Sequence, residues 1–242
     1  MAQTLIPHKI HYCWFGHNPK PKLIQKCIAS WSKMNPDWEI IEWNESNYDV
    51  TKIPYIAQAY EQRKWAFVVD FARFDILNNE GGIFLDADVE CLKPFPDEML
   101  ELNAFSGFEN GKQIAPGLAF GSVPGHPVLK SIMEEYYKRE NLDTSETICD
   151  IVTGLLVRNG LQINDTLQTI CDVTIYPSNF FCCFDHETQS FDIQPHTISI
   201  HHYFASWSPW YRKAYFRTIK YAVKILGKEN YLKIKRIIKQ KR

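Results

Sequence analysis

Residues 65–90 (WAFVVDFARFDILNNEGGIFLDADVE) constrain the fold of this chain of 242 residues more than any other stretch. The first half repeats apolar residues at helical spacing and ends in NNEGG at residues 78–82, which predicts a helix followed by a glycine turn. Residues 83–85 (IFL) are wholly apolar, as in a short strand that is buried on both faces. Asp86 and Asp88 follow at once. This order favours an α/β fold with two carboxylates at the carboxyl end of a strand.

The spacing of Asp86 and Asp88 suggests a metal site. Side chains alternate along a strand, so residues two apart point the same way. Two close carboxylates on an apolar strand repel each other unless a cation neutralises them, and their hard oxygens suit Mg²⁺ or Mn²⁺. On the preceding helix, Asp70 and Arg73 share a face. Each feature alone also fits a solvated turn or a surface ion pair, but their order along the chain favours a site.

This order resembles the sugar-binding region of the family 32 glycosyltransferases, which include fungal initiating α-mannosyltransferases and bacterial capsule enzymes. It is similar also to the catalytic domains of clostridial glucosylating toxins. The family pattern reads roughly S-D-x-x-R-x-x-x-L-x-x-x-G-G-x-Y-x-D-x-D. The chain matches this pattern at Asp70, Arg73, Leu77, Gly81, Gly82, Asp86 and Asp88. It departs from the pattern at Val69 and Phe84, where serine and tyrosine are usual.

The resemblance implies roles for these residues. It implies a single GT-A-type, Rossmann-like domain that binds a nucleotide sugar. Asp70 and Arg73 would hold the donor sugar, and Asp86 and Asp88 would bind the metal and take part in catalysis. Phe84 would lie against the donor, without the phenolic hydrogen bond that tyrosine offers there.

The start of the chain extends the resemblance. Residues 6–15 (IPHKIHYCWF) predict a first strand, residues 19–34 an amphipathic helix and residues 38–43 a second strand, which together form a βαβ unit. Such alternation favours a mostly parallel sheet with helices on both faces. The family begins I-P-K-x-I-H-x-x-W-x-G, and this implies that Trp14 stacks on the nucleotide base. The alternative is that Trp14 simply closes the end of the first strand.

Residues 198–210 (ISIHHYFASWSPW) are similar to the H-H-x-x-x-S-W element of the family. The resemblance implies that His201 or His202 completes the metal shell and that Ser206 and Trp207 contact the diphosphate. Neighbouring residues of a strand point in opposite directions, so at most one of the two histidines should face the metal. A packed histidine beside a core tryptophan is the alternative.

Cysteines and hydropathy indicate the compartment. The seven cysteines show no repeated pair spacing, which favours free thiols in a reducing environment. The first residues do not form a secretory signal, and no apolar run reaches about 18 residues, the length of a membrane span. We therefore expect a cytoplasmic protein.

The last residues differ in charge from the rest. Residues 208–242 contain eight lysines, four arginines and one glutamate, a formal charge of +11. Because the net formal charge of the whole chain is −1, residues 1–207 carry a formal charge of −12. Basic and apolar residues fall on opposite sides of two predicted helices around Gly227. We expect a catalytic domain over residues 1–207 and a basic helical tail over residues 208–242. The tail suits an anionic membrane surface more than nucleic acid, and a merely solvated face is the alternative.

The sequence thus predicts a retaining, metal-dependent glycosyltransferase. It would move a hexose or N-acetylhexosamine from a nucleotide-diphosphate sugar, UDP-linked rather than GDP-mannose, to a saccharide acceptor. The acceptor would be lipid-linked, at the cytoplasmic membrane face of a bacterium that builds a surface polysaccharide. One alternative is a haloacid-dehalogenase-like phosphohydrolase, because residues 84–89 (FLDADV) also fit its D-x-D-x-[TV] motif. Another is a non-catalytic protein that binds membrane surfaces.

Overall fold

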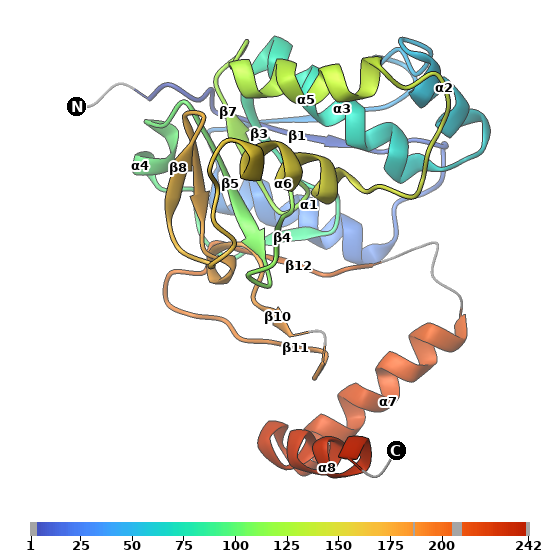
Figure 1. The fold of residues 1–242 in the computed structure, drawn as a ribbon, viewed down its shortest axis with the longest axis vertical. Helices are drawn as coiled ribbons and strands as arrows, with labels where there is room; N and C mark the ends of the chain where they lie inside the picture. The colour runs from blue at the N-terminus through green and yellow to red at the C-terminus, as the bar shows by residue number, and fades with distance from the viewer. Residues whose placement is uncertain (1–3, 186, 205–209, 241–242) are drawn as a thin grey trace.

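A computed structural model describes residues 4–185, 187–204 and 210–240, and its centre is an eight-stranded sheet (Figure 1). The strands follow the order β2-β1-β3-β7-β5-β9-β8, and β6 pairs with β5. Their bounds are β1 (Lys9–Cys13), β2 (Glu39–Trp43), β3 (Gly82–Phe84), β5 (Ala104–Glu109), β6 (Gln113–Ile114), β7 (Phe120–Ser122), β8 (Gln168–Ile170) and β9 (Val173–Tyr176). β1 pairs in parallel with both β2 and β3, and β5 with β9, whereas β7 and β6 pair antiparallel with their neighbours and β8 pairs antiparallel with β9, so the sheet is mixed rather than mostly parallel. The predicted α/β fold is confirmed.

Helices cover both faces of this sheet. On one face lie α2 (Pro54–Glu61), α3 (Trp65–Glu80), α5 (Pro127–Tyr137) and α6 (Ile148–Arg158) (Figure 1). The other face carries α1 (Lys22–Met34) and the short α4 (Asp97–Leu100). Phe71 and Phe74 of α3 and Trp31 of α1 are fully buried, and each such side chain contributes roughly 1.5–3 kcal/mol by leaving water. The sheet is buried on both sides, as its apolar strands require.

The glycine turn after α3 forms as the sequence predicts. Gly81 and Gly82 have φ angles of +63° and +94°, values that favour glycine. A Cβ on Gly82 would lie 2.8 Å from the backbone oxygen of Lys9. The two glycines therefore end α3 and let β3 enter the sheet directly beside β1.

The position of the two aspartates differs from the prediction in one respect. β3 ends at Phe84, so Asp86 and Asp88 lie in a turn rather than on the strand. The backbone N–H of Val89 donates to the oxygen of Asp86 at 2.9 Å and closes that turn. It leads into β4 (Val89–Cys91), which pairs antiparallel with β12 (Ser199–His201). This pairing places the last strand of the body beside the carboxylate turn.

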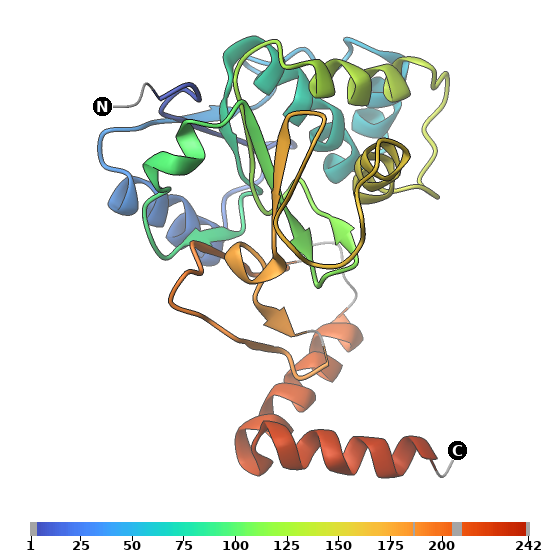
Figure 2. The same ribbon diagram turned by 60° about the vertical axis from the view of Figure 1, so that its left-hand side comes forward.

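The remaining elements lie below the sheet in Figure 1. The 3₁₀ turn η1 (Ser178–Phe180) precedes a small hairpin of β10 (Phe184–Asp185) and β11 (Ser190–Phe191). Beyond it, α7 (Trp210–Leu226) and α8 (Lys228–Gln240) extend away from the body (Figures 1 and 2). The predicted boundary at residues 207–208 falls within 205–209, outside the described residues. None of the described helices combines the length and apolar character needed to cross a membrane.

Candidate active site

Asp86, Asp88 and His201 form a cluster in which one potential ligand atom of each residue lies within 4.8 Å of the others. The Nε2 atom of His201 is 2.9 Å from Oδ1 of Asp88. The carboxylates come from the turn after β3, and the imidazole comes from β12. Two hard oxygens and a borderline nitrogen at this spacing fit a divalent cation such as Mn²⁺ or Mg²⁺.

Asp88 and His201 determine each other's charge. Burial alone would raise the pKa of Asp88, but His201 and the Phe204 N–H, which donates to Asp88 Oδ2 at 2.7 Å, lower it to about 2. Burial likewise favours neutral His201, yet the Asp88 carboxylate raises the pKa of His201 to about 9. Without a metal the two residues form a partly buried ion pair. A cation that bound through the imidazole would therefore have to displace a proton.

Asp86 is held from two sides. Its Oδ1 accepts a hydrogen bond from Arg73 Nη2 at 2.7 Å, and its backbone N–H donates to the Gly117 oxygen at 2.9 Å. A Cβ on Gly117 would lie only 2.0 Å from Oδ2 of Asp86. Gly117 is thus a site residue that sequence reasoning missed. The available signal was the run of small residues within residues 114–123 (IAPGLAFGSV).

Arg73 and Phe84 form the base of the site. The guanidinium lies 5.1 Å from the centre of the Phe84 ring, and the Arg73 residue is only 2% exposed. Phe84 is 0% exposed, which corrects the expectation that it contacts the donor. Its ring packs in the core and supports Arg73. Among the described residues, Nε and Nη1 of Arg73 have no hydrogen-bond partner.

Asp70 lies on the same helix and near the same charges. Its burial, opposed by Arg73 and reinforced by the charge of Asp86, raises the pKa of Asp70 to about 7. The Asp70 charge also contributes to raising the pKa of Tyr136 on α5. The Tyr136 hydroxyl is buried and has no partner within the described part of the chain. Tyr136 and Arg73 therefore offer unsatisfied donors beside Asp70, where a ligand or water can accept from them.

Trp14 follows β1 at the carboxyl edge of the sheet, the edge at which β3 also ends. The indole N–H donates to the Asn18 oxygen at 2.7 Å, and Lys20 Nζ lies 5.9 Å from the ring centre. The residue is partly exposed. It packs partly against the core, so both predicted roles, stacking on a base and closing the strand end, stay predictions.

The two histidines point to different partners, as strand alternation requires. His201 faces the carboxylates, whereas Nε2 of His202 lies 2.8 Å from Oε2 of Glu90. His202 is therefore not part of the cluster. Ser206 and Trp207, predicted to contact the diphosphate, lie outside the described residues.

Comparison with known proteins identifies the family. Residues 2–181 match the family model described as "Capsular polysaccharide synthesis protein", which covers well over half of the chain. The chain belongs to this family. Its site residues up to Gly117 and Tyr136 lie inside the matched region, whereas His201 lies beyond it.

Several curated proteins are similar over shorter regions. "Subversion of eukaryotic traffic protein A" of Legionella pneumophila is 31% identical over 125 residues, 40% of this chain and 19% of that protein. An uncharacterized glycosyltransferase of Acanthamoeba polyphaga mimivirus is 29% identical, covering 57% and 58% of the two chains. A mannosyl phosphorylinositol ceramide synthase of Saccharomyces cerevisiae is 27% identical, covering 56% and 37%. The chain thus spans less than two thirds of the length of these relatives.

A solved structure supports the fold. The chain superposes on the structure titled "PaToxG Glycosyltransferase" with a TM-score of 0.52 at 17% identity, covering 63% of this chain and 69% of that one. This likeness agrees with the GT-A-type architecture. The family match favours the glycosyltransferase class over a phosphohydrolase or a non-catalytic binding protein.

Proposed function

We propose that this protein is a metal-dependent, retaining glycosyltransferase that uses a nucleotide-diphosphate sugar. The observation that carries the proposal is the Asp86–Asp88–His201 cluster, which lies beside Arg73 in a chain of the capsular polysaccharide synthesis family. The cluster lies next to the carboxyl ends of neighbouring parallel strands, where α/β folds bind nucleotides.

The chemistry requires charge neutralisation at the leaving group. As the anomeric bond breaks, the nucleoside diphosphate gains negative charge. Mn²⁺ or Mg²⁺, when bound to Asp86, Asp88 and His201, would supply a compensating positive charge. Asp86 keeps its orientation through Arg73 and the close backbone of Gly117, and Asp88 keeps its orientation through the Phe204 N–H.

The sugar and the base would occupy separate sides of this cluster. Asp70 and Arg73 provide an acceptor and donors for sugar hydroxyls, which orients the anomeric carbon. Trp14 provides a face for the base, and Lys20 beside its ring pairs with Glu42 at 2.7 Å. Retention of the anomeric configuration follows the resemblance to family 32. UDP-hexose or UDP-N-acetylhexosamine is our first choice of donor. GDP-mannose is our second choice of donor. By their names, the relatives include both a mannosyltransferase and an N-acetylglucosaminyltransferase.

The acceptor is proposed to be a saccharide, carried on a lipid and used for a bacterial surface polysaccharide at the cytoplasmic membrane face. Exposed side chains on α7 and α8 support the membrane contact: Tyr221 is 68% and Ile225 is 79% exposed. Along the sequence of the tail, lysines and arginines alternate with such apolar residues. Helices of this kind bind anionic membrane surfaces through apolar burial and electrostatic attraction.

Thermal-shift measurements with UDP, GDP and their sugars, with and without Mn²⁺, test this function. We expect one nucleotide to raise Tm by about 5–10 °C at saturation, and only with the metal present. Trp14→Ala should weaken nucleotide binding about 10-fold or more, because base stacking is worth about 1–3 kcal/mol. Metal-independent binding, or release of inorganic phosphate from phosphate esters, would contradict the proposal.

A further inference from the structure

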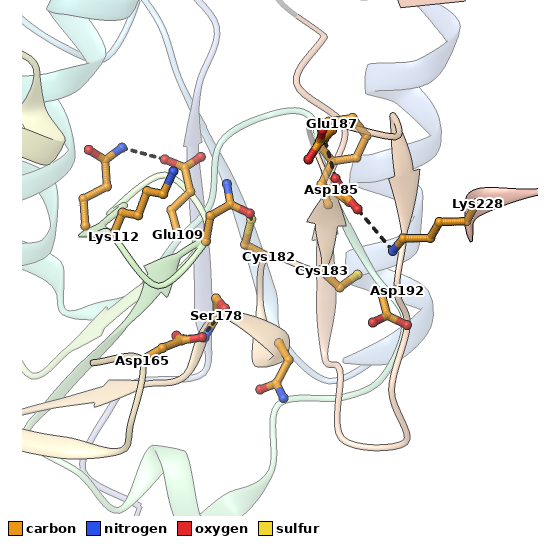
Figure 3. Close-up of a pocket in the computed structure, with 14 residues that line it drawn as sticks. Glu109, Lys112, Asp165, Ser178, Cys182, Cys183, Asp185, Glu187, Asp192 and Lys228 are labelled. Atoms are coloured by element: carbon orange, nitrogen blue, oxygen red, sulfur yellow. Dashed lines mark hydrogen bonds and ion pairs between the residues drawn. The ribbon is translucent and has the colours of Figure 1, made fainter. Parts of the chain in front are cut away.

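A cavity of about 640 Å³ opens beside the proposed active site (Figure 3). Its walls come from the end of β5, the 3₁₀ turn η1, the β10–β11 hairpin and Lys228 at the start of α8. In Figure 3, Glu109 and Lys112 lie across the cavity from Asp185 and Lys228. The volume lies within the range of about 300–1,000 Å³ that small-molecule sites occupy.

Two contacts connect this cavity to the carboxylate–histidine cluster. Glu109, which lines the cavity, accepts a hydrogen bond from the Tyr203 hydroxyl at 2.6 Å. The Tyr203 ring in turn lies 4.2 Å from the His201 ring, centre to centre. Tyr203 thus separates the cavity from the cluster, and a molecule in the cavity would lie beside the reaction centre.

The lining of the cavity is acidic and rich in hydrogen-bonding groups. It contains five carboxylates, those of Glu109, Asp165, Asp185, Glu187 and Asp192, and the two lysines Lys112 and Lys228. Lys228 pairs with Asp185 at 3.1 Å and Lys235 pairs with Glu187 at 3.2 Å, whereas Asp192 has no ion pair with any described residue. The amides and hydroxyl of Asn110, Gln113 and Ser178 add neutral partners for sugar hydroxyls.

We propose that this cavity is the acceptor-saccharide site and that it selects neutral or amino-bearing sugars over acidic ones. The inference rests on the proposed glycosyltransferase function. A uronic acid or a phosphorylated sugar would place a negative charge among the five carboxylates, and like charges in a partly enclosed cavity repel strongly. An amino sugar would instead gain from the same field.

The charge pattern also separates the two substrates. The diphosphate of the donor suits the side of the cluster that carries Arg73 and a bound cation. The acidic cavity would repel that diphosphate, so the donor and the acceptor would not compete for one place.

The test measures transfer from the accepted nucleotide sugar to matched disaccharides that differ in one group: a hydroxymethyl, a carboxylate or an amino group. We expect kcat/KM for the acidic acceptor to be at least about 10-fold below that for the neutral one at low salt, with the gap narrowing in about 0.5 M salt. Asp192→Asn and, more strongly, Asp192→Lys should raise the acidic-to-neutral ratio. Asp37→Asn removes the same charge from an exposed residue between α1 and β2, outside the cavity, and should leave the ratio unchanged.

Equal or better use of the acidic acceptor, or an unchanged ratio in both Asp192 variants, would overturn the assignment. It would also be overturned if no member of the panel accepts sugar while the enzyme still transfers the sugar to water. Donor binding is followed by thermal shift in the same samples. If the nucleotide sugar neither binds nor is hydrolysed, the proposed function itself has failed.

Discussion

The carboxylate site and the helical tail differ in the contacts that fix their positions. The polar atoms that orient Asp86 and Asp88 come from α3, from β12 and from Phe204 just after β12, and Arg73 beneath them is 2% exposed. The ion pairs that tie α8 to the body are Lys228–Asp185 at 3.1 Å and Lys235–Glu187 at 3.2 Å. Most of the large apolar side chains described on the two tail helices are exposed.

This difference shows which region is complete without a partner. Exposed ion pairs contribute about 0–1 kcal/mol each, so they cannot fix the tail as firmly as packing fixes the site. The site has its geometry before any ligand arrives. The tail has apolar surface that only another surface can cover. Changes in the site should therefore affect chemistry, and changes in the tail should affect attachment.

The largest expected effect is that of Asp88→Asn. We expect transfer to fall about 1,000-fold, because charge neutralisation by a bound metal is worth several kcal/mol. Loss of the repulsion between the carboxylates of Asp86 and Asp88 would by itself make the substitution stabilising. His201, however, is buried against Asp88, so the variant should lose about 1–3 kcal/mol in the free energy of unfolding. Urea denaturation and product formation measure the two effects.

The matched control is Glu61→Gln, which neutralises an exposed carboxylate at the end of α2. It should change neither activity nor stability. If the Asp88→Asn variant transfers sugar at a near-normal rate in Mn²⁺, Asp88 is not a metal ligand. Changes in the site would then not affect chemistry more than changes in the tail do.

Asp70→Asn should lower the rate of transfer about 100-fold, less than Asp88→Asn does. Unlike Asp88→Asn, it should raise the stability of the protein. The pKa of Asp70 rises from 3.8 to about 7 on folding, so the folded state retains a proton that the unfolded state releases. The free energy of unfolding of the wild type therefore falls as the pH rises from about 4 to 7, and above pH 7 the folded state is destabilised in full by the ionised carboxylate. Asparagine has no charge, so it does not destabilise the folded state in this way.

The variant should consequently be more stable than the wild type by about 1–3 kcal/mol near pH 8 and no more stable near pH 3. Urea titrations at both pH values measure this difference. A stability gain that is independent of pH would show that Asp70 has the same pKa in the folded and unfolded states, and that its pKa is not raised.

The smallest effect is expected in the tail. Lys220→Gln combined with Lys224→Gln should weaken binding to anionic vesicles about 10-fold, since each surface lysine contributes up to about 1 kcal/mol there. Transfer to a water-soluble acceptor should not change. The control combines Lys22→Gln and Lys33→Gln on α1, which remove the same charge from the body. Co-sedimentation that is equally weak with anionic and neutral vesicles at low salt would exclude the membrane contact.

Local patterns predicted much of the fold. Helical spacing, the two glycines and the apolar run at residues 83–85 predicted α3, the turn and β3, because each depends on neighbours in the sequence. The βαβ unit at the start of the chain also formed as predicted. The DxD spacing brought Asp86 and Asp88 together, although a turn rather than strand alternation does so.

Contacts between distant residues escaped prediction. The small residues around Gly117 indicate a close approach but not that a carboxylate makes it, and Tyr136 has the sequence pattern of an ordinary core residue of a helix. Phe84 was expected at the donor because the family has tyrosine there. In this chain the missing hydroxyl leaves a ring that packs wholly in the core beneath Arg73. The cavity depends on the hairpin and α8, which no single motif specifies.

The pairing of β12 with β4 has a consequence for the order of synthesis. His201 follows Asp88 by 113 residues, so at about 5–20 residues per second a ribosome makes the carboxylates roughly 6–23 s before it makes the histidine. Until then Asp88 lacks its imidazole and the Phe204 N–H, and β4 lacks its partner strand. The three residues of the cluster can therefore come together only after nearly all of the body has been synthesised.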